Sequence, residues 1–168
     1  HWLDALGLPR PPPGVWAVLG EDLLDARPDA SPELHWAGAR VQRWRNVLHA
    51  DRLHEPLALD WEQAWHGGEP LALPTGDTME LIGADAFDAP LRVHARQGGE
   101  RIALPRRTHS HALKHVLQER GLHPCERARL PLLFAAAGTL LAAGTDILAA
   151  VFADWLDRHN ARLRRSLA

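Results

Sequence analysis

The sequence predicts an α+β fold, in which short helices and strands follow one another along a chain of 168 residues. Two segments near the start space their apolar residues at every third or fourth position, as a helix does. From residue 33 the pattern changes to alternation, and from residue 57 short apolar runs are bounded by glycine and proline. We therefore predict a small helical domain with a β-hairpin, a β-rich connector, and a basic C-terminal domain of short strands packed with helices, over residues 1–56, 57–90 and 91–168.

The two N-terminal segments are predicted to be helices. In HWLDALGL the apolar residues Trp2, Leu3 and Leu6 have helical spacing, and Gly7 ends the pattern. Prolines at 11–13 then form a stiff connector, because proline fixes its own φ and restrains the residue before it. The second helix is predicted in GVWAVLGEDLLDA, which carries acidic residues opposite its apolar side and is ended by RPDASP.

A β-hairpin is predicted next, in PELHWAGARVQRWRNVLHAD. Its strands cover residues 33–36 and 40–48, and the dipeptide Ala37-Gly38 forms the turn between them. Alternation places two sets of side chains on opposite faces, namely Val41, Arg43 and Arg45 on one face and Arg40, Gln42 and Trp44 on the other. The arginine-bearing face is a basic spot in an acidic half of the chain, and the alternative interpretation is a solvated strand face.

Two similar segments, GGEPLALP at 67–74 and GGERIALP at 98–105, each predict a glycine turn and a short strand that a proline closes. The clearest predicted helix covers residues 110–121, with Ser110 as its N-cap and Gly121 just past its end. Its two faces carry Ala112, Leu113, Val116 and Leu117 on the apolar side and His111, Lys114, His115 and Gln118 on the polar side.

The least polar window, residues 130–145, predicts two short buried strands joined by a turn around Gly138. It is shorter than the roughly 20 residues that a membrane-spanning helix needs, and it contains Pro131. A last amphipathic helix is predicted over residues 147–163, and it ends in the basic sequence RLRRSLA.

Charge is distributed unevenly along the chain. Residues 1–90 carry 6 arginines and 15 carboxylates, a balance of −9, whereas residues 91–168 carry 13 basic residues and 6 carboxylates, a balance of +7. Such opposite halves favour two modules, of which the second suits a phosphate backbone. The equally weighted alternative is that the two halves attract each other or that the arginines are solvated.

No catalytic machinery is predicted. The three serines, Ser31, Ser110 and Ser166, are explained as turn, cap and tail residues, and no histidine is paired by the sequence with Cys125. The single cysteine excludes a disulfide framework and fits a reducing cytoplasm. No signal-peptide pattern opens the sequence, and its start, HWLDALGLP, leads us to expect a fragment of a longer protein.

An alternative hypothesis rests on the histidines of RTHSHALKHVLQERGLHPC. His111 and His115, four positions apart on one helical face, can share a metal ion, and His109 can approach from the preceding strand. Structural zinc sites are usually rich in cysteine, however, and this chain has one. The alternative function is thus a non-catalytic zinc-binding or protein-interaction module that uses these three histidines.

The stretch LKHVLQERGLHPCERARLPLLFAAAGTLLAAG, at 113–144, resembles the signature of the C-terminal domain of bacterial tRNA(Ile)-lysidine synthetases. That family shows Leu-Lys, a helix ending in Gln-Glu-x-Gly, a Pro-Trp-x-Arg segment and a Pro-Leu-Leu strand. Upstream, RQGGERIALPRRTHSHALK is similar to the family's Arg-x-Gly-Gly-Glu-Arg sequence, and DARPDASPELHWAGARVQRWRNVL resembles its substrate-binding domain. The matching positions of the first stretch are Leu113, Lys114, Gln118, Glu119, Gly121, Pro124, Arg127, Pro131, Leu132 and Leu133.

Two positions depart from the family pattern. Cys125 stands where the family usually has tryptophan, and Arg106 stands where glycine is common before Arg107. We expect the first departure to loosen packing beneath the helix, and the second bears on the conformation of the loop.

The resemblance implies part of an ATP-dependent ligase that attaches lysine to the wobble cytidine of the CAU anticodon of tRNA(Ile). It also implies a C-terminal fold shared with part of the phenylalanyl-tRNA synthetase β subunit. In the family, ATP, Mg²⁺ and lysine belong to an N-terminal domain with a Ser-Gly-Gly-x-Asp-Ser loop, and this sequence contains no such motif. No cofactor, metal or membrane partner is therefore expected for these residues, and the expected partner is tRNA(Ile).

Candidate site residues follow from the chemistry of RNA. Structured RNA is recognised mainly through phosphates, 2′-hydroxyls and shape, which requires dispersed cations. We predict a phosphate-binding surface at the basic family positions and a second contact from the arginine-bearing strand. Its members are Arg96, Arg101, Arg107, Lys114, Arg127 and Arg129, with Arg43 and Arg45 from the first domain.

Overall fold

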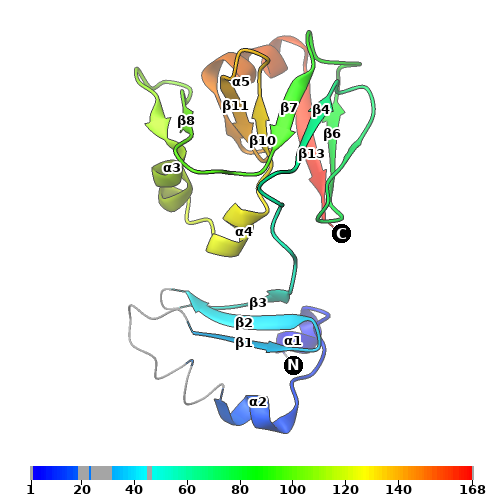
Figure 1. Cartoon of the computed structure of the whole chain (residues 1–168), viewed down its shortest axis with the longest axis vertical. Coiled ribbons are helices and arrows are strands. Elements are labelled where there is room, and N and C mark those ends of the chain that lie inside the picture. The colour runs from blue at the N-terminus through cyan, green and yellow to red at the C-terminus, as the bar shows by residue number, and fades with distance from the viewer. Residues whose placement is uncertain (1, 19–22, 24–31, 45–46, 168) are drawn as a thin grey trace. The chain divides into compact units, whose positions relative to one another are not determined.

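The computed structural model describes residues 2–18, 23, 32–44 and 47–167 of the chain. It divides into two compact units, residues 1–54 and 55–168, which we describe separately (Figure 1). Short helices and antiparallel strands occur in both units, so the predicted α+β class is confirmed. None of the helices in the described ranges is long and apolar enough to cross a membrane.

The first unit is a three-stranded antiparallel sheet accompanied by two short helices. The elements are α1 Trp2–Ala5, α2 Pro13–Val18, β1 Glu33–Trp36, β2 Ala39–Trp44 and β3 Val47–Arg52. The predicted turn is confirmed, because Ala37 and Gly38 both have positive φ, 43° and 76°, as a two-residue turn requires. The predicted second strand, residues 40–48, is wrong in its extent, because β2 ends at Trp44 and β3 pairs back on it in antiparallel register. Most of the rest of the second predicted helix, residues 19–22 and 24–26, lies outside the described residues.

Both faces of β2 carry buried side chains, although the alternating sequence suggested one buried and one solvated face. Val41 is fully buried in the core of the unit, yet Arg40 and Gln42 on the opposite face are also buried. Arg40 lies opposite Asp51 of β3 and donates to its carboxylate, with Nη2 at 2.6 Å from Oδ2. The face that carries Val41 and Arg43 is therefore the core side of the sheet.

The second unit contains a five-stranded antiparallel sheet in the order β12-β11-β10-β7-β4, a three-stranded sheet β13-β6-β5, and the pair β8-β9. The strands are β4 Glu62–Trp65, β5 Leu71–Ala72, β6 Thr78–Ile82, β7 Leu91–His94, β8 Arg101–Ile102, β9 His111–Ala112, β10 Leu132–Phe134, β11 Leu140–Ala143, β12 Ile147–Leu148 and β13 Arg162–Ser166. The helices are α3 Leu113–Glu119, α4 Pro124–Ala128 and α5 Ala150–Arg158.

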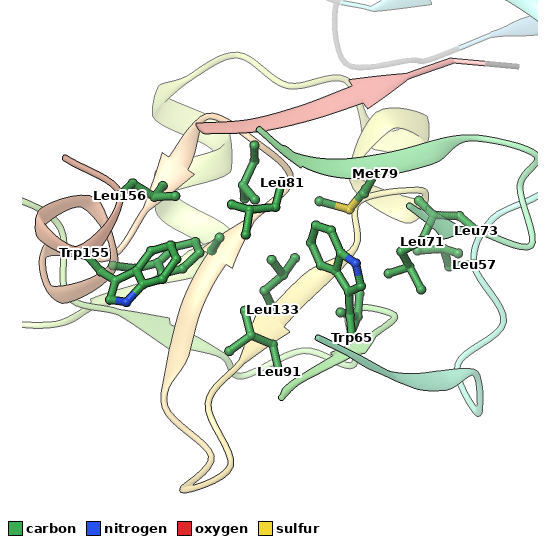
Figure 2. Close-up of a cluster of buried hydrophobic side chains, with 14 of the residues drawn as sticks. Leu57, Trp65, Leu71, Leu73, Met79, Leu81, Leu91, Leu133, Trp155 and Leu156 are labelled. Atoms are coloured by element: carbon green, nitrogen blue, oxygen red, sulfur yellow. The ribbon is translucent and has the colours of Figure 1, made fainter. Parts of the chain in front are cut away.

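Two hydrophobic cores lie on the two faces of the five-stranded sheet. Leu132 and Leu133 are consecutive in β10 and point to opposite faces, and both are fully buried. Leu133 belongs to the core that α5 and the three-stranded sheet cover, where Trp65 and Met79 also pack (Figure 2). Leu132 belongs to the core that α3 covers. A strand buried on both faces explains why the sequence there is continuously apolar.

Several local predictions are confirmed. β10 and β11 pair around Gly138, whose φ is 85°, and each of the two similar glycine segments leads into a short strand, β5 or β8. α3 buries the predicted apolar face and exposes Lys114. It ends with Gly121 at φ 69° and with Leu122 N–H donating to Leu117 C=O, the hydrogen-bond pattern of a glycine C-cap.

Two predictions of helix extent are wrong. The helix predicted from Ser110 begins at Leu113 instead, because the residues before it pair with β8 as strand β9. The helix predicted over 147–163 is a strand, a nine-residue helix and a second strand, β12, α5 and β13. Residues 162–166 of the basic tail form β13, which pairs with β6 in antiparallel register.

The segment predicted as a connector, 57–90, contributes to the same sheets as the residues that follow it. β4 pairs with β7, and β6 pairs with β13. The structure accordingly places the segment in one compact unit with residues 91–168.

Candidate RNA-binding surface

Residues 96–127 carry seven basic side chains and three carboxylates, and we call this stretch the basic segment. It forms β8, β9, α3 and α4, which lie near one another on one side of the second unit in the view of Figure 1. Five of the eight predicted site residues belong to it, namely Arg96, Arg101, Arg107, Lys114 and Arg127.

The basic segment begins with a turn at residues 97–100, which we call the glycine turn, and its backbone is arranged around the Glu100 carboxylate. Glu100 Oε1 accepts hydrogen bonds from the backbone N–H groups of Gln97 at 2.6 Å and Gly98 at 2.7 Å. Gly98 and Gly99 have φ of 97° and 82°, a conformation that favours glycine. Glu100 Oε2 also lies 3.6 Å from Nε of Arg96, so the turn holds that cation at its start. The Arg-x-Gly-Gly-Glu pattern thus describes one turn, in which the glutamate accepts two backbone hydrogen bonds and forms an ion pair with the arginine.

Arg101 fixes the loop between β8 and β9. Its Nε donates to Oγ of Ser110 at 3.0 Å, and its Nη2 donates to the Ser110 carbonyl at 2.5 Å. Ser110 therefore does not cap α3 as predicted, and the N-cap position is Ala112. The Arg101 side chain remains exposed, so it can meet a phosphate while it holds the loop.

Lys114 and Arg107 extend the surface along α3. The helix is attached to the glycine turn, because the N–H of Leu113 donates to the carbonyl of Glu100 at 2.8 Å. Lys114 lies in the first turn of the helix and is exposed. Arg107 is half-exposed, and its Nη2 lies 3.9 Å from the Glu119 carboxylate, a loose ion pair in solvent.

Arg127 lies in α4, which is a short but well-capped helix. The buried His123 is its N-cap, and Glu126 completes a capping box by accepting from the His123 N–H at 3.0 Å. Nε of Arg127 donates to the Leu122 carbonyl at 2.8 Å, and this hydrogen bond holds the guanidinium group at its Nε atom. Cys125, where the family usually has tryptophan, is partly buried in this helix.

Arg129 is placed differently from the other predicted site residues. Its Nη2 donates to both carboxylate oxygens of Asp77, at 3.0 and 3.1 Å, and Arg165 binds the same carboxylate. Asp77 is fully buried, and the two arginine side chains are about 85% buried, because their exposed fractions are 14% and 15%. Arg129 is thus part of a buried ion triad that links β13 to the rest of the unit.

In the first unit the structure describes one of the two predicted site residues, Arg43. Arg43 shares its face with the buried Val41, and its Nη1 donates to the Leu23 carbonyl at 3.2 Å. Arg45 lies outside the described residues. Contact of any of the eight residues with RNA stays a prediction.

Two basic residues of the segment were missed as candidates. Arg106 and Arg120 are both exposed, and Nη1 of Arg120 is 3.4 Å from the Asp146 carbonyl. Neither arginine matches a residue of the family pattern. Only their position among the other basic residues of the segment could have indicated them as candidates.

The charge asymmetry of the sequence does not separate the two compact units. Residues 1–54 carry 6 arginines and 7 carboxylates, and residues 55–168 carry 13 basic residues and 14 carboxylates, so each unit has a balance of −1. Within the second unit, Glu62 pairs with Arg92, and Glu80 pairs with Arg164. Acidic residues of the first half of the sequence thus do form ion pairs with basic residues of the second half. The basic segment keeps an excess positive charge of +4.

The histidines do not form the arrangement that the zinc hypothesis needs. His111 lies in β9 and His115 in α3, so they do not share a helical face. His123 is committed to capping α4, with Nδ1 accepting from the Cys125 N–H at 3.3 Å. Among the residues that the structure describes, no group of three or more His, Cys, Asp or Glu side chains could hold a metal ion.

Known proteins match both units. The family described as "TilS substrate binding domain" matches residues 1–49, and "TilS substrate C-terminal domain" matches residues 91–164. A tRNA(Ile)-lysidine synthase of Xanthomonas campestris pv. campestris (strain 8004) is 44% identical over 158 residues, which cover 93% of this chain and 36% of that protein. One of Xylella fastidiosa (strain Temecula1) is 40% identical over 168 residues, covering 97% and 38%.

Among solved structures, "Crystal structure of TILS C-terminal domain" is similar, with a TM-score of 0.49, 21% identity, and coverage of 64% of this chain and 98% of that one. The present chain spans little more than a third of the length of the curated relatives that it matches. With its substrate-binding domain at 1–49 and its C-terminal domain at 91–164, the chain belongs to the TilS family.

Proposed function

We propose that this chain is the tRNA-recognition part of a tRNA(Ile)-lysidine synthetase. Such an enzyme ligates lysine to the wobble cytidine of the CAU anticodon of tRNA(Ile) with the use of ATP. The observation that carries the proposal is the match of both domains to one family, in which the relatives named above are tRNA(Ile)-lysidine synthases. In this proposal lysine, ATP and Mg²⁺ are bound by a part of the enzyme outside these residues, and the work takes place in the cytoplasm, where tRNA is found.

The basic segment supports this role by its chemistry. Its cations are spread over β8, α3, α4 and the loops between them, and three of them are held in place, Arg96 by the glycine turn, Arg101 by Ser110 and Arg127 by Leu122. Dispersed cations on rigid elements bind phosphates and orient a structured RNA without performing chemistry on it. We propose Arg96, Arg101, Arg107, Lys114 and Arg127 as the principal phosphate contacts, and Arg43, Arg45 and Arg129 as the weaker candidates.

The experiment is a titration of tRNA(Ile) with the 168-residue chain over a range of salt concentrations. If four to five phosphates are neutralised, log K should fall with log[salt] with a slope of about −4. Lys114→Gln should reduce the magnitude of that slope by about one. Arg158→Gln is the matched control, because Arg158 is an exposed cation of α5 outside the basic segment, and it should leave the slope unchanged. A flat plot for the unmodified chain would refute the proposal.

A further inference from the structure

A pocket of about 500 Å³ lies beside α4, within the second unit. Three segments form it: the chain before β4, the start of the glycine turn, and α4 itself. The lining residues that matter here are Pro56, Leu57, Leu59, Arg96, Pro124 and Arg127. A volume of this size lies within the usual range of pockets that bind small molecules, roughly 300–1,000 Å³.

Hydrogen bonds fix the walls of this pocket. The N–H of Leu57 donates to the carbonyl of Ala128 at 3.0 Å, which holds the chain before β4 against α4. Nε2 of Gln97 donates to the carbonyl of Leu59 at 3.2 Å, which holds the glycine turn against the same chain. Figure 1 shows this chain passing α4 on its way to β4. The pocket is therefore a built feature of the fold.

Two arginines from different segments, Arg96 and Arg127, line the pocket. Arg96 has an exposed side-chain fraction of 24%, and its Nε is buried without a hydrogen bond, 3.6 Å from the Glu100 carboxylate. That carboxylate also accepts from two backbone N–H groups, so its charge is shared. No carboxylate occurs among the pocket's described lining residues, and the lining therefore favours an anion.

The remaining walls are apolar. Leu59 is 67% exposed at the pocket although it is a large hydrophobic residue, and Pro56 and Pro124 are also part of the lining. By contrast, the pocket beside Phe87 and Trp155 contains Asp88, and the hollow beside Val151 contains Asp154 and Asp157, which disfavour a polyanion. A pocket with cations next to apolar walls suits a single unstacked nucleotide, because the phosphate can contact the cations and the base can contact the walls.

We infer that this pocket binds one unstacked nucleotide of tRNA, with its phosphate between Arg96 and Arg127 and its base against Leu59 and Pro124. The inference rests on the proposed function and adds a specific site to it. A paired nucleotide does not fit, because its base is enclosed in the helix and only its phosphate is presented. The pocket thus selects an unpaired part of the tRNA, whereas the rest of the basic segment binds phosphates of any kind.

The test compares two variants with the same change of charge. Leu59→Glu places a carboxylate at the mouth of the pocket, and the exposed Leu59 is not needed for the core. Val151→Glu is the matched control, because Val151 is 62% exposed in α5 and lies outside this pocket. We expect Leu59→Glu to weaken binding of tRNA(Ile) and of a single-stranded RNA pentanucleotide about tenfold, and Val151→Glu to weaken either less than twofold.

A blunt RNA duplex and a pentanucleotide with an abasic centre complete the experiment. The two variants should bind the duplex equally, and the abasic RNA should bind the unmodified chain several-fold more weakly than the intact pentanucleotide. Equal binding of tRNA by both variants, or equal binding of abasic and intact RNA, would overturn the inference. Either result leaves the proposed function standing if the unmodified chain still binds tRNA with a negative salt slope, whereas loss of that slope removes both.

Discussion

At the scale of single residues, Arg106 carries a conformation that its side chain disfavours. Its φ is 61°, and it follows Pro105 in a turn that the Arg107 N–H closes by donating to the Leu104 carbonyl at 3.2 Å. Proline at the second position and a positive φ at the third are the features of a type II turn, in which glycine is favoured at the third position. The family's common glycine at this place therefore has a backbone reason.

We predict that Arg106→Gly stabilises the chain. The left-handed conformation costs a residue with a Cβ roughly 1 kcal/mol, so the free energy of unfolding should rise by about 0.5–1 kcal/mol, measured by denaturation in urea. Arg106→Ala keeps the Cβ and removes the same charge, so it should give no such gain. Equal stability of the two variants would show that charge, and not the backbone, decides the effect.

The candidate site could be predicted from sequence only as a set of cations. Composition and the family pattern predicted Arg96, Arg101 and Arg127 as members of one phosphate-binding surface. Whether an arginine faces solvent or a carboxylate depends on residues far away in the chain, as in Arg129, whose partner Asp77 lies 52 positions earlier. No local pattern carries that information, because an ion pair is a property of the folded structure.

At the scale of elements, prediction succeeded where short-range chemistry decides the structure. The Ala37-Gly38 turn and the end of α3 at Gly121 are each set by a positive φ that few residues adopt. Prediction failed for β9 and β13, where pairing with a distant strand overrides the local preference. In β13 Leu163 is the only buried apolar residue, so its sequence carries no strong alternation of apolar and polar residues.

The pairing of β4 with β7 should depend on pH. Glu62 accepts from Nε and Nη2 of Arg92 at 2.8 and 2.7 Å, and these hydrogen bonds lower the pKa of Glu62 below its ordinary value of 4.5. Because the folded pKa is depressed, the stabilisation is present above pH 4.5 and is lost as the pH falls through the folded pKa. The pair is exposed, so the effect on stability is small.

The measurement is an NMR titration of the Glu62 carboxyl carbon in the unmodified chain and in Arg92→Gln. We expect the pKa of Glu62 to lie below 4.5 in the first and to rise toward 4.5 in the second. Arg164→Gln removes a cation of β13 that pairs with Glu80, and it should leave the Glu62 titration unchanged. An unchanged Glu62 titration in Arg92→Gln would rule out the hydrogen-bonded pair as the cause.

At the scale of the whole molecule, the opposite charges of the two halves of the sequence act inside one compact unit. Acidic residues of 55–90 form ion pairs with arginines of 91–168, and among these pairs the carboxylate of Asp77 is fully buried. It follows β5, and its two partners lie just before β10 and in β13. One carboxylate thus joins three segments that are distant in sequence, which ties the end of the chain into the unit.

Asp77→Ala should therefore cost far more stability than the loss of an exposed pair between the same strands. Removal of the carboxylate leaves two arginine side chains that are about 85% buried without their common partner, a change that typically costs 3–5 kcal/mol. Arg164→Gln, which breaks the half-exposed pair with Glu80 across β6 and β13, should cost less than about 1 kcal/mol. Urea denaturation gives both values, and amide hydrogen exchange in β6 and β13 locates the loss.

If the two variants were equally stable, the triad would contribute no more than a surface contact. A large difference would instead mean that Asp77, a carboxylate of the acidic half, holds together the unit that carries the basic segment.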